Sequence, residues 1–204
     1  MEAINLFNQW VDAGKDDGME LNHTPSVNSM FNLIPSKILN SSFRFLDVGC
    51  GNGWVVKKIS SFKECTYAVG IDGAEKMISK AISNDEKSKY LKVDLNQLGD
   101  YKDNFDIIFS MEVFYYLKNP QITINHIFNH LLNKNGCFII GIDHYLENKP
   151  SLKWPIDLNV HMWTYSILQW KALFRSAGFK NIIIEQFGQK NDWSGTLVLY
   201  GEKH

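Results

Sequence analysis

A glycine-rich segment is the part of the sequence that most clearly indicates chemistry. Residues 45–54 read FLDVGCGNGW, so an apolar run ends near Asp47 and is followed at once by Gly49, Gly51 and Gly53. Glycine is favoured where the backbone takes positive φ or approaches a ligand closely. The first N–H groups of a helix have no partner within that helix and can face such a ligand. The segment therefore predicts a strand, a ligand-binding turn and a helix.

Acidic residues follow two further apolar runs. Asp72 lies 23 residues beyond Gly49, close to the spacing of about 20 residues at which an acidic side chain meets ribose hydroxyls in nucleotide-binding folds. Asp94 ends the next short run. In open α/β sheets, ligands bind at the carboxyl ends of the strands. We therefore expect Asp47, Asp72 and Asp94 to lie at one ligand-binding edge.

A dinucleotide is a less suitable ligand than a nucleoside with a positive centre. Dinucleotide sites need the spacing G-x-G-x-x-G, in which the third glycine lets the helix pack closely on the strand. Here Trp54 occupies the place of that third glycine. Three acidic residues also suit a ligand without phosphates.

Short apolar runs alternate with helical patterns along the middle of the chain. Expected strands cover residues 43–48, 66–71, 90–93, 105–110 and 137–142. Expected helices between them cover residues 54–62, 74–83 and 120–132. This alternation predicts a parallel sheet built with right-handed crossovers.

The two ends of the chain have a different pattern. Apolar residues from Ile4 onward recur at helical spacing, and Thr24-Pro25 resembles the start of a second helix, with proline at its first position. A helix over 166–177 should end at Gly178. Strands over 179–187 and 195–200 then predict an antiparallel hairpin at the sheet edge.

Composition excludes several classes of protein. The chain has 204 residues with 21 Lys and Arg against 22 Asp and Glu, a net charge of -1. A dedicated binder of nucleic acid or of anionic membranes needs an excess of basic groups. The three cysteines are odd in number and widely spaced, which fits a reducing compartment. With no signal peptide or membrane span recognised, we expect a cytoplasmic protein.

With these segments the chain resembles the class I S-adenosylmethionine-dependent methyltransferases, in particular small-molecule enzymes of the type 11/12-like subgroup. The resemblance implies an α/β fold with a Rossmann-like seven-stranded mixed sheet, mostly parallel with an antiparallel C-terminal hairpin, flanked by helices. Residues 1–40 would form an N-terminal helical cap within the same domain as the cofactor-binding part, 41–204. The segments that carry the resemblance are residues 46–53, 70–72, 93–95, 105–113 and 131–140.

The resemblance also implies the cofactor and its contacts. S-adenosylmethionine would be converted to S-adenosylhomocysteine, with Asp47 near its amino group, Asp72 on its ribose and Asp94 on its adenine edge. Met77 would pack on the adenine. The implied cofactor-binding residues are Asp47, Gly49, Cys50, Gly51, Asn52, Gly53, Asp72, Gly73, Met77, Asp94, Leu95, Ser110 and Met111.

The methyl acceptor is less well defined by the sequence. The segment Asp143-His144-Tyr145 follows the fifth expected strand and is a candidate for a general base or an orienting group. His161 and His23 are further candidates for this role. No metal site is expected, because His126 and His130 lack a matching third ligand. Residues expected to line the acceptor pocket are His23, Tyr115, Tyr116, Trp154 and Trp163.

These observations favour a methyltransferase that acts by in-line displacement on an O, N or C atom of a small molecule. The expected partner is that small molecule, with no nucleic acid and no membrane, and the protein would be a monomer or homodimer. The alternatives are a non-catalytic S-adenosylmethionine-binding protein, an NAD(P)-dependent oxidoreductase, and a relative that transfers an aminopropyl group.

Overall fold

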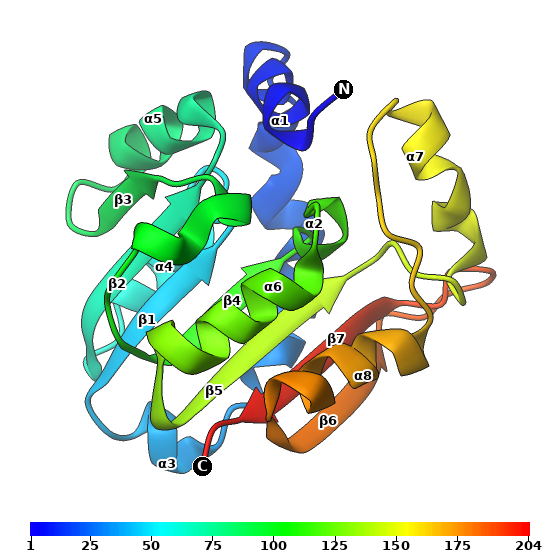
Figure 1. Ribbon diagram of the computed structural model, residues 1–204. Helices are drawn as coiled ribbons and strands as arrows, with labels where there is room; N and C mark the ends of the chain where they lie inside the picture. Colours follow the sequence, from blue (N-terminus) through cyan, green and yellow to red (C-terminus); the bar gives the residue numbers. More distant parts are fainter.

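The computed structural model describes residues 1–204, apart from the side chain of Asp100. Seven strands form one sheet at its centre (Figure 1). They are β1 (Phe43–Val48), β2 (Cys65–Asp72), β3 (Lys89–Lys92), β4 (Phe105–Met111), β5 (Leu132–Ile142), β6 (Lys180–Phe187) and β7 (Thr196–Glu202).

The strand order is β3-β2-β1-β4-β5-β7-β6. Strands β1 to β5 pair in parallel, whereas β7 is antiparallel to both β5 and β6. The chain thus places β7 inside the sheet and leaves β6 at the edge. The predicted mixed seven-stranded sheet with an antiparallel C-terminal pair is confirmed.

Helices cover both faces of the sheet and its upper edge (Figure 1). The α-helices are α1 (Ala3–Asp12), α2 (Met19–Phe31), α3 (Ser36–Leu39), α4 (Trp54–Ser60), α5 (Glu75–Asn84), α6 (Pro120–His126), α7 (Trp154–Asp157) and α8 (Ile167–Ala177). Single turns of other types are η1 (Lys15–Gly18), η2 (Leu95–Asp100), η3 (Phe114–Tyr116), η4 (Ile127–Leu131) and η5 (Lys149–Lys153). Among the described residues no helix is both long and apolar enough to cross a membrane.

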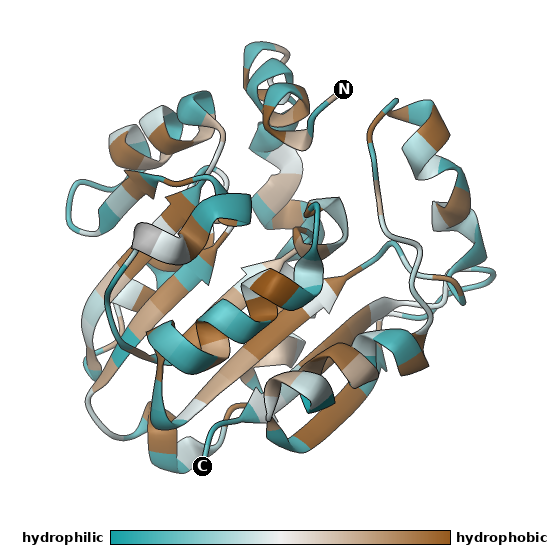
Figure 2. Ribbon diagram, viewed as in Figure 1, coloured by the Kyte–Doolittle hydropathy of each residue, from teal (hydrophilic) through white to brown (hydrophobic). Residues whose placement is uncertain are grey.

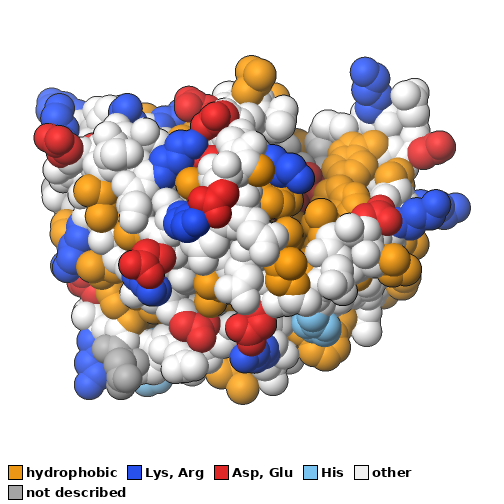
Figure 3. Space-filling view, turned by 90° about the horizontal axis from the view of Figure 1, so that it is seen from above, with side chains coloured by type: hydrophobic (Ala, Val, Ile, Leu, Met, Phe, Trp, Pro, Cys, Tyr) orange, Lys and Arg blue, Asp and Glu red, His pale blue; other side chains and the backbone are white. Residues whose placement is uncertain are grey.

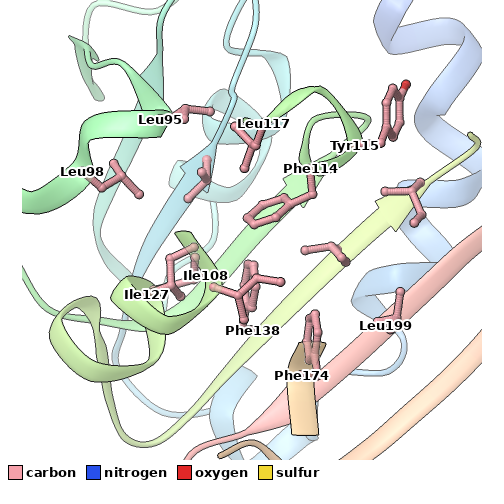
Figure 4. Close-up of a cluster of buried hydrophobic side chains, with 14 of the residues drawn as sticks. Leu95, Leu98, Ile108, Phe114, Tyr115, Leu117, Ile127, Phe138, Phe174 and Leu199 are labelled. Carbon is pink, nitrogen blue, oxygen red and sulfur yellow. The ribbon is translucent and has the colours of Figure 1, made fainter. Parts of the chain in front are cut away.

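Two hydrophobic clusters lie on opposite faces of the sheet, because successive strand side chains point to opposite sides. In β1, Phe45 joins the cluster packed by α2, α4 and α5, whereas Leu46 joins the cluster packed by α6 and α8. The central strands are accordingly apolar on both faces (Figure 2). In the second cluster the Phe138 ring of β5 stacks on the Phe174 ring of α8, with centroids 5.3 Å apart (Figure 4).

The predicted start of the second helix is wrong. Helix α2 begins at Met19, so Pro25 lies inside it. The η1 turn already directs the chain into the helix, because its buried Asp16 contacts both Asn52 and Lys80. The hydrogen bond that Pro25 cannot donate would fall on the Leu21 carbonyl, and both residues are on the exposed side of α2.

The predicted helix over 120–132 is also longer than the observed one. Helix α6 ends at His126 and gives way to a π turn, and β5 begins at Leu132. The Lys203 ammonium donates to the carbonyls of Leu132 (2.8 Å) and Phe128 (2.5 Å). These two bonds occupy carbonyls that a continuing α-helix would direct to its own backbone.

The N-terminal segment is attached to α5 by ion pairs. Lys76 binds Asp12 of α1 at 2.6 Å, and Lys80 binds Asp16 and Asp17 of η1 at 2.7 and 2.5 Å. The exposed pairs with Asp12 and Asp17 contribute little stability each, whereas Asp16 is buried. Together the three pairs hold α1 and η1 against α5. That residues 1–40 form an N-terminal helical cap within the same domain stays a prediction.

Candidate active site

A cavity of about 610 Å³ lies at the carboxyl ends of β1, β2, β4 and β5. Its other walls come from α1, α2 and the region of α7, which stand above this edge of the sheet (Figure 1). Figure 3 looks down on this end of the molecule and shows apolar side chains gathered between α1 and α7. The volume is in the range of small-molecule sites.

The glycine loop forms the floor of one half of this cavity. Gly49 (φ 82°) and Gly51 (φ 52°) both line it. A Cβ on Gly49 would lie 2.3 Å from a methyl carbon of Val113, whereas one on Gly51 would lie 3.7 Å from the Met19 sulfur. Only glycine leaves this floor clear for a ligand.

Asp72 is held against the glycine loop by backbone donors. Its Oδ2 accepts the Gly51 N–H at 3.0 Å, and its Oδ1 accepts the Ala74 N–H at 2.8 Å. Burial raises the pKa of this carboxyl group, and the backbone donors, including Gly73, oppose that rise. Each oxygen keeps a further lone pair, so the carboxylate can accept two more hydrogen bonds from the cavity.

The end of this half away from Gly49 is lined mainly by apolar side chains. Met77 and Leu95 are buried and line it, as do Gly73 and Asp94. The Asp94 carboxylate caps η2 by accepting the Asn96 N–H at 2.9 Å. Asp94 therefore has a structural role as the N-cap of η2. It also lines the cavity, where a ligand can reach it.

Eight of the residues predicted to bind cofactor meet in this cavity, and five do not line it. Gly53 is the N-cap of α4, and a Cβ there would collide with Tyr90. Ser110 donates to the Val48 carbonyl at 2.6 Å. The eight that line the cavity are Gly49, Gly51, Asp72, Gly73, Met77, Asp94, Leu95 and Met111.

The remaining three residues support the loop from beneath. Asn52 donates its amide to the Asp16 carbonyl at 3.1 Å. Asp47 is 2% exposed, and burial together with Asp72 raises its pKa well above the usual value. Burial and the same two carboxylates raise the pKa of the Cys50 thiol, which makes it a poor nucleophile.

The other half of the cavity carries the carboxylates of Glu112 and Asp143. No role was predicted from sequence for Glu112, and Asp143 was predicted only as part of the segment 143–145. Glu112 directly follows β4, and its carboxylate accepts the Tyr115 hydroxyl at 2.7 Å and the backbone N–H of Asp143. Asp143 directly follows β5. Burial and the neighbouring Asp143 raise the pKa of Glu112 well above its usual value. The rule that led to Asp47, Asp72 and Asp94 applies equally to these two positions.

His23 faces the same half from α2. Burial lowers the pKa of its imidazole, and the nearby Asp143 carboxylate partly opposes this. Burial raises the pKa of Asp143, against a hydrogen bond from Thr196 and the effect of His23. His23, Tyr115, Tyr116 and Trp154 line the cavity as predicted from sequence. Trp10 and Phe7 of α1 complete its aromatic wall.

Of the residues predicted as a general base or orienting group, His23 and Asp143 line the cavity, whereas His144, Tyr145 and His161 do not. His144 is fully buried, with Nδ1 2.9 Å from the Ser151 carbonyl oxygen and Nε2 2.9 Å from the Thr164 hydroxyl. The buried Tyr145 hydroxyl donates to the Gly195 carbonyl at 2.9 Å. Neither side chain lines the cavity. Both side chains instead hold the loop that follows β5 against neighbouring segments.

Two further predicted residues also lie outside the cavity wall. His161 is exposed, and its ring meets the Trp163 ring edge-on at 5.1 Å. The Trp163 indole donates to the Leu117 carbonyl at 2.9 Å, and its backbone N–H donates to the Tyr115 carbonyl at 2.8 Å. Trp163 thus supports the turn that carries Tyr115 without lining the cavity.

A metal centre finds no support in the described part of the chain, where no group of three or more His, Cys, Asp or Glu side chains is placed to hold an ion. A nucleoside cofactor fits better. The glycine floor, the Asp72 carboxylate and the apolar side chains of Met77 and Leu95 match the loop, ribose and base contacts of such a ligand.

This fold and cavity define a Rossmann-like domain with a nucleoside-cofactor site at the carboxyl edge of its sheet. The family model for a methyltransferase domain matches residues 10–183. The chain therefore belongs to this family of methyltransferases.

Solved structures share the fold over most of the chain. A methyltransferase from Haloferax volcanii, solved with the Trm112 methyltransferase activator, superposes with a TM-score of 0.82 at 24% identity, covering 97% of this chain and 98% of that chain. Magnesium protoporphyrin IX methyltransferase from Synechocystis PCC 6803, solved with S-adenosylhomocysteine, has a TM-score of 0.69 at 17% identity over 92% of this chain and 86% of that chain.

Sequence similarity to curated relatives is confined to part of the chain. The malonyl-[acyl-carrier protein] O-methyltransferase of Bacillus anthracis is 32% identical over 94 residues, which is 45% of this chain and 35% of that protein. The matched part spans about a third of the length of the curated relatives. The names of these relatives and neighbours describe different acceptors, so the family does not define the acceptor of this chain.

Proposed function

We propose that this protein methylates a small molecule held in the half of the cavity lined by Glu112, Asp143 and His23. One observation carries the proposal: a single cavity joins the cofactor half to a second half with its own titratable and aromatic side chains. Its volume of about 610 Å³ suits a small compound better than a polymer. The net charge of -1 also disfavours a nucleic-acid substrate.

The cofactor half has the groups to bind and orient the nucleoside. Asp72 would accept both ribose hydroxyls, Met77 and Leu95 would enclose the base, and Asp94 would face its edge. Asp47 would act on the amino-acid end from beneath the loop. When bound, S-adenosylmethionine supplies a methyl group on a positively charged sulfur.

In the acceptor half, His23 would remove the proton that the acceptor must lose. An imidazole whose pKa is lowered by burial is neutral at pH 7 and can accept a proton. Asp143 would stabilise the imidazolium that results. Aromatic side chains of α1 and η3 would exclude water and position the acceptor, and orientation of this kind can account for several kcal/mol of rate acceleration.

Ligand binding to purified protein tests the cofactor assignment. S-adenosylmethionine and S-adenosylhomocysteine should each raise the melting temperature, whereas NAD and NADP should not. At 100 times its dissociation constant a ligand stabilises by about 2.7 kcal/mol, which corresponds to roughly 5–10 °C for a domain of this size. A shift with nicotinamide cofactors alone would contradict the proposal.

Turnover distinguishes an enzyme from a binding protein. Incubation with labelled S-adenosylmethionine and a panel of small acceptors should release S-adenosylhomocysteine together with a methylated product. Binding without product from any acceptor class would favour the non-catalytic alternative.

The remaining properties are also proposals. The thiols of Cys50, Cys65 and Cys137 are free, which supports a reducing, cytoplasmic location. A monomer or homodimer is the assembly that we propose, and sedimentation analysis of the purified protein tests it.

A further inference from the structure

The acceptor half of the cavity holds a buried carboxylate with an unsatisfied oxygen. Asp143 is 8% exposed and lines the cavity. Its Oδ1 has no hydrogen-bond partner in the described part of the chain. A buried carboxylate without its full set of donors is costly. A cationic or donating ligand beside the part of Asp143 that lines the cavity would offset that cost.

The charged residues that line the cavity indicate the sign of the charge on that ligand. The described residues lining it include five carboxylates and, from Lys and Arg, Lys15 alone. Asp72 and Asp94 belong to the cofactor half, which leaves Glu112, Asp143 and Asp157 on the acceptor side. Among the described residues, none of these three forms an ion pair.

Aromatic rings surround the same space. Tyr115 and Tyr116 lie with their centroids 4.4 Å apart, and Phe7 meets Tyr116 edge-on at 5.3 Å. Trp10 and Trp154 also line the cavity. Figure 4 shows Tyr115 at the end of the core cluster with its hydroxyl pointing away from the core. Ring faces of this kind bind flat apolar groups and cations.

We propose that the methyl acceptor is a small amine, carried on a flat apolar body and bound as an ammonium ion between Asp143 and Glu112. This inference rests on the proposed function and adds the chemical class of the substrate. A carboxylate acceptor would place a third anion beside two carboxylates and is disfavoured by repulsion. An alcohol would satisfy one oxygen but would leave both charges without a counterion.

An ammonium nitrogen must lose one proton before its electron pair can react. In the proposed step the N–H bond breaks, the proton moves to a ring nitrogen of His23, and the electron pair stays on the amine nitrogen. The imidazolium then releases the proton to solvent. The titratable groups on this side of the cavity are Asp143, Glu112, Tyr115 and Tyr116, with Asp157 at the rim.

Calorimetric titration of the protein saturated with S-adenosylhomocysteine tests this inference without turnover. The probes are two matched sets: 2-phenylethylamine, 2-phenylethanol and phenylacetate, and the larger tryptamine, tryptophol and indole-3-acetate. In at least one set the amine should bind at least tenfold more tightly than the matched alcohol and acid. Asp143→Asn should reduce this preference to less than threefold, whereas the surface variant Asp192→Asn should leave it unchanged.

Several outcomes would overturn the inference. It is wrong if the alcohol or acid binds as tightly as the amine in both sets, or if Asp143→Asn and Glu112→Gln both leave the preference intact. It is also wrong if Asp143→Asn weakens S-adenosylmethionine much more than S-adenosylhomocysteine, since the carboxylate would then serve the cofactor's cation. Failure of S-adenosylhomocysteine to bind to the unmodified protein would instead remove the proposed function, and this inference with it.

Discussion

The carboxylates in the two halves of the cavity differ in how fully the protein itself supplies their hydrogen bonds. In the cofactor half, Asp72 accepts two backbone N–H groups, and Asp94 accepts one. In the acceptor half, Asp143 is 8% exposed and has one oxygen without a hydrogen-bond partner in the described part of the chain. The chain itself pre-organises the first half, whereas we propose that a ligand completes the second. Carboxylates whose hydrogen bonds the protein already supplies are fixed in place and orient a ligand. Carboxylates that lack such bonds favour a ligand that can supply them.

Among the variants that distinguish the two halves of the cavity, a substitution in the glycine loop should have the largest effect. Gly49→Ala places a Cβ against Val113 at positive φ. Left-handed backbone costs about 1–2 kcal/mol and overpacking about 1–3 kcal/mol, so we expect a loss of stability in urea denaturation and weaker S-adenosylhomocysteine binding by calorimetry.

Gly188→Ala is the matched control for that variant. Gly188 also has positive φ (75°), but nothing lies within 4 Å of its Cβ position. It should show the backbone cost alone, about 1 kcal/mol, with unchanged cofactor binding. Equal effects of both variants on the cofactor would show that the Val113 contact is irrelevant.

Asp72→Asn should give the next largest effect, on cofactor affinity. Loss of charge-assisted hydrogen bonds costs about 1.5–3 kcal/mol. This corresponds to a roughly 10- to 150-fold larger dissociation constant for S-adenosylhomocysteine. Calorimetry with S-adenosylhomocysteine measures it. Glu112→Gln, in the other half, should change the same constant by less than about threefold. A similar loss from both variants would mean that the division into two halves is incorrect.

Trp154→Leu should affect only the acceptor half. Removing an aromatic face costs a bound ammonium or flat ring about 1 kcal/mol, or roughly fivefold in the affinity of 2-phenylethylamine. S-adenosylhomocysteine affinity should stay the same. His161→Ala changes an exposed ring outside the cavity, so it should alter neither affinity; a large effect there would restore the base role predicted from sequence.

Asp143→Asn should give the smallest effect, a pH-dependent gain in stability. Because the folded pKa of Asp143 is raised, the folded state binds more protons than the unfolded state from about pH 4 up to that raised pKa. Stability of the unmodified protein therefore falls over this window. The variant should be more stable by about 1 kcal/mol at pH 8, and the difference should shrink toward pH 4.

Urea denaturation at several pH values measures that gain. Asp192→Asn, on the exposed surface, should show no such trend. A variant that is less stable than the unmodified protein at pH 8 would show that the Thr196 bond and the effect of His23 outweigh the cost of burial.

Features set by local pattern were predictable from sequence. The glycine loop, Asp72 and Asp94 combine residue type, spacing and strand position, and the short, mostly apolar runs predicted the strands of the sheet. The direction in which a side chain points, and hence whether it lines the cavity, could not be predicted from sequence. His144 and Asp143 are neighbours in sequence, yet only Asp143 points to the cavity. Likewise the start of α2 depends on contacts of Asp16 with Asn52 and Lys80, which are distant along the chain.

The contact between Gly49 and Val113 has a consequence for the order of events. Val113 is next to Glu112, a non-glycine residue held at φ 60°, so the floor of the cofactor half packs directly on the turn that carries an acceptor carboxylate. We expect a ligand that orders either side to favour the arrangement of this turn that the other ligand needs. Thermodynamic linkage then requires each ligand to tighten the other by the same factor, and the protein would hold its acceptor best once the cofactor is in place.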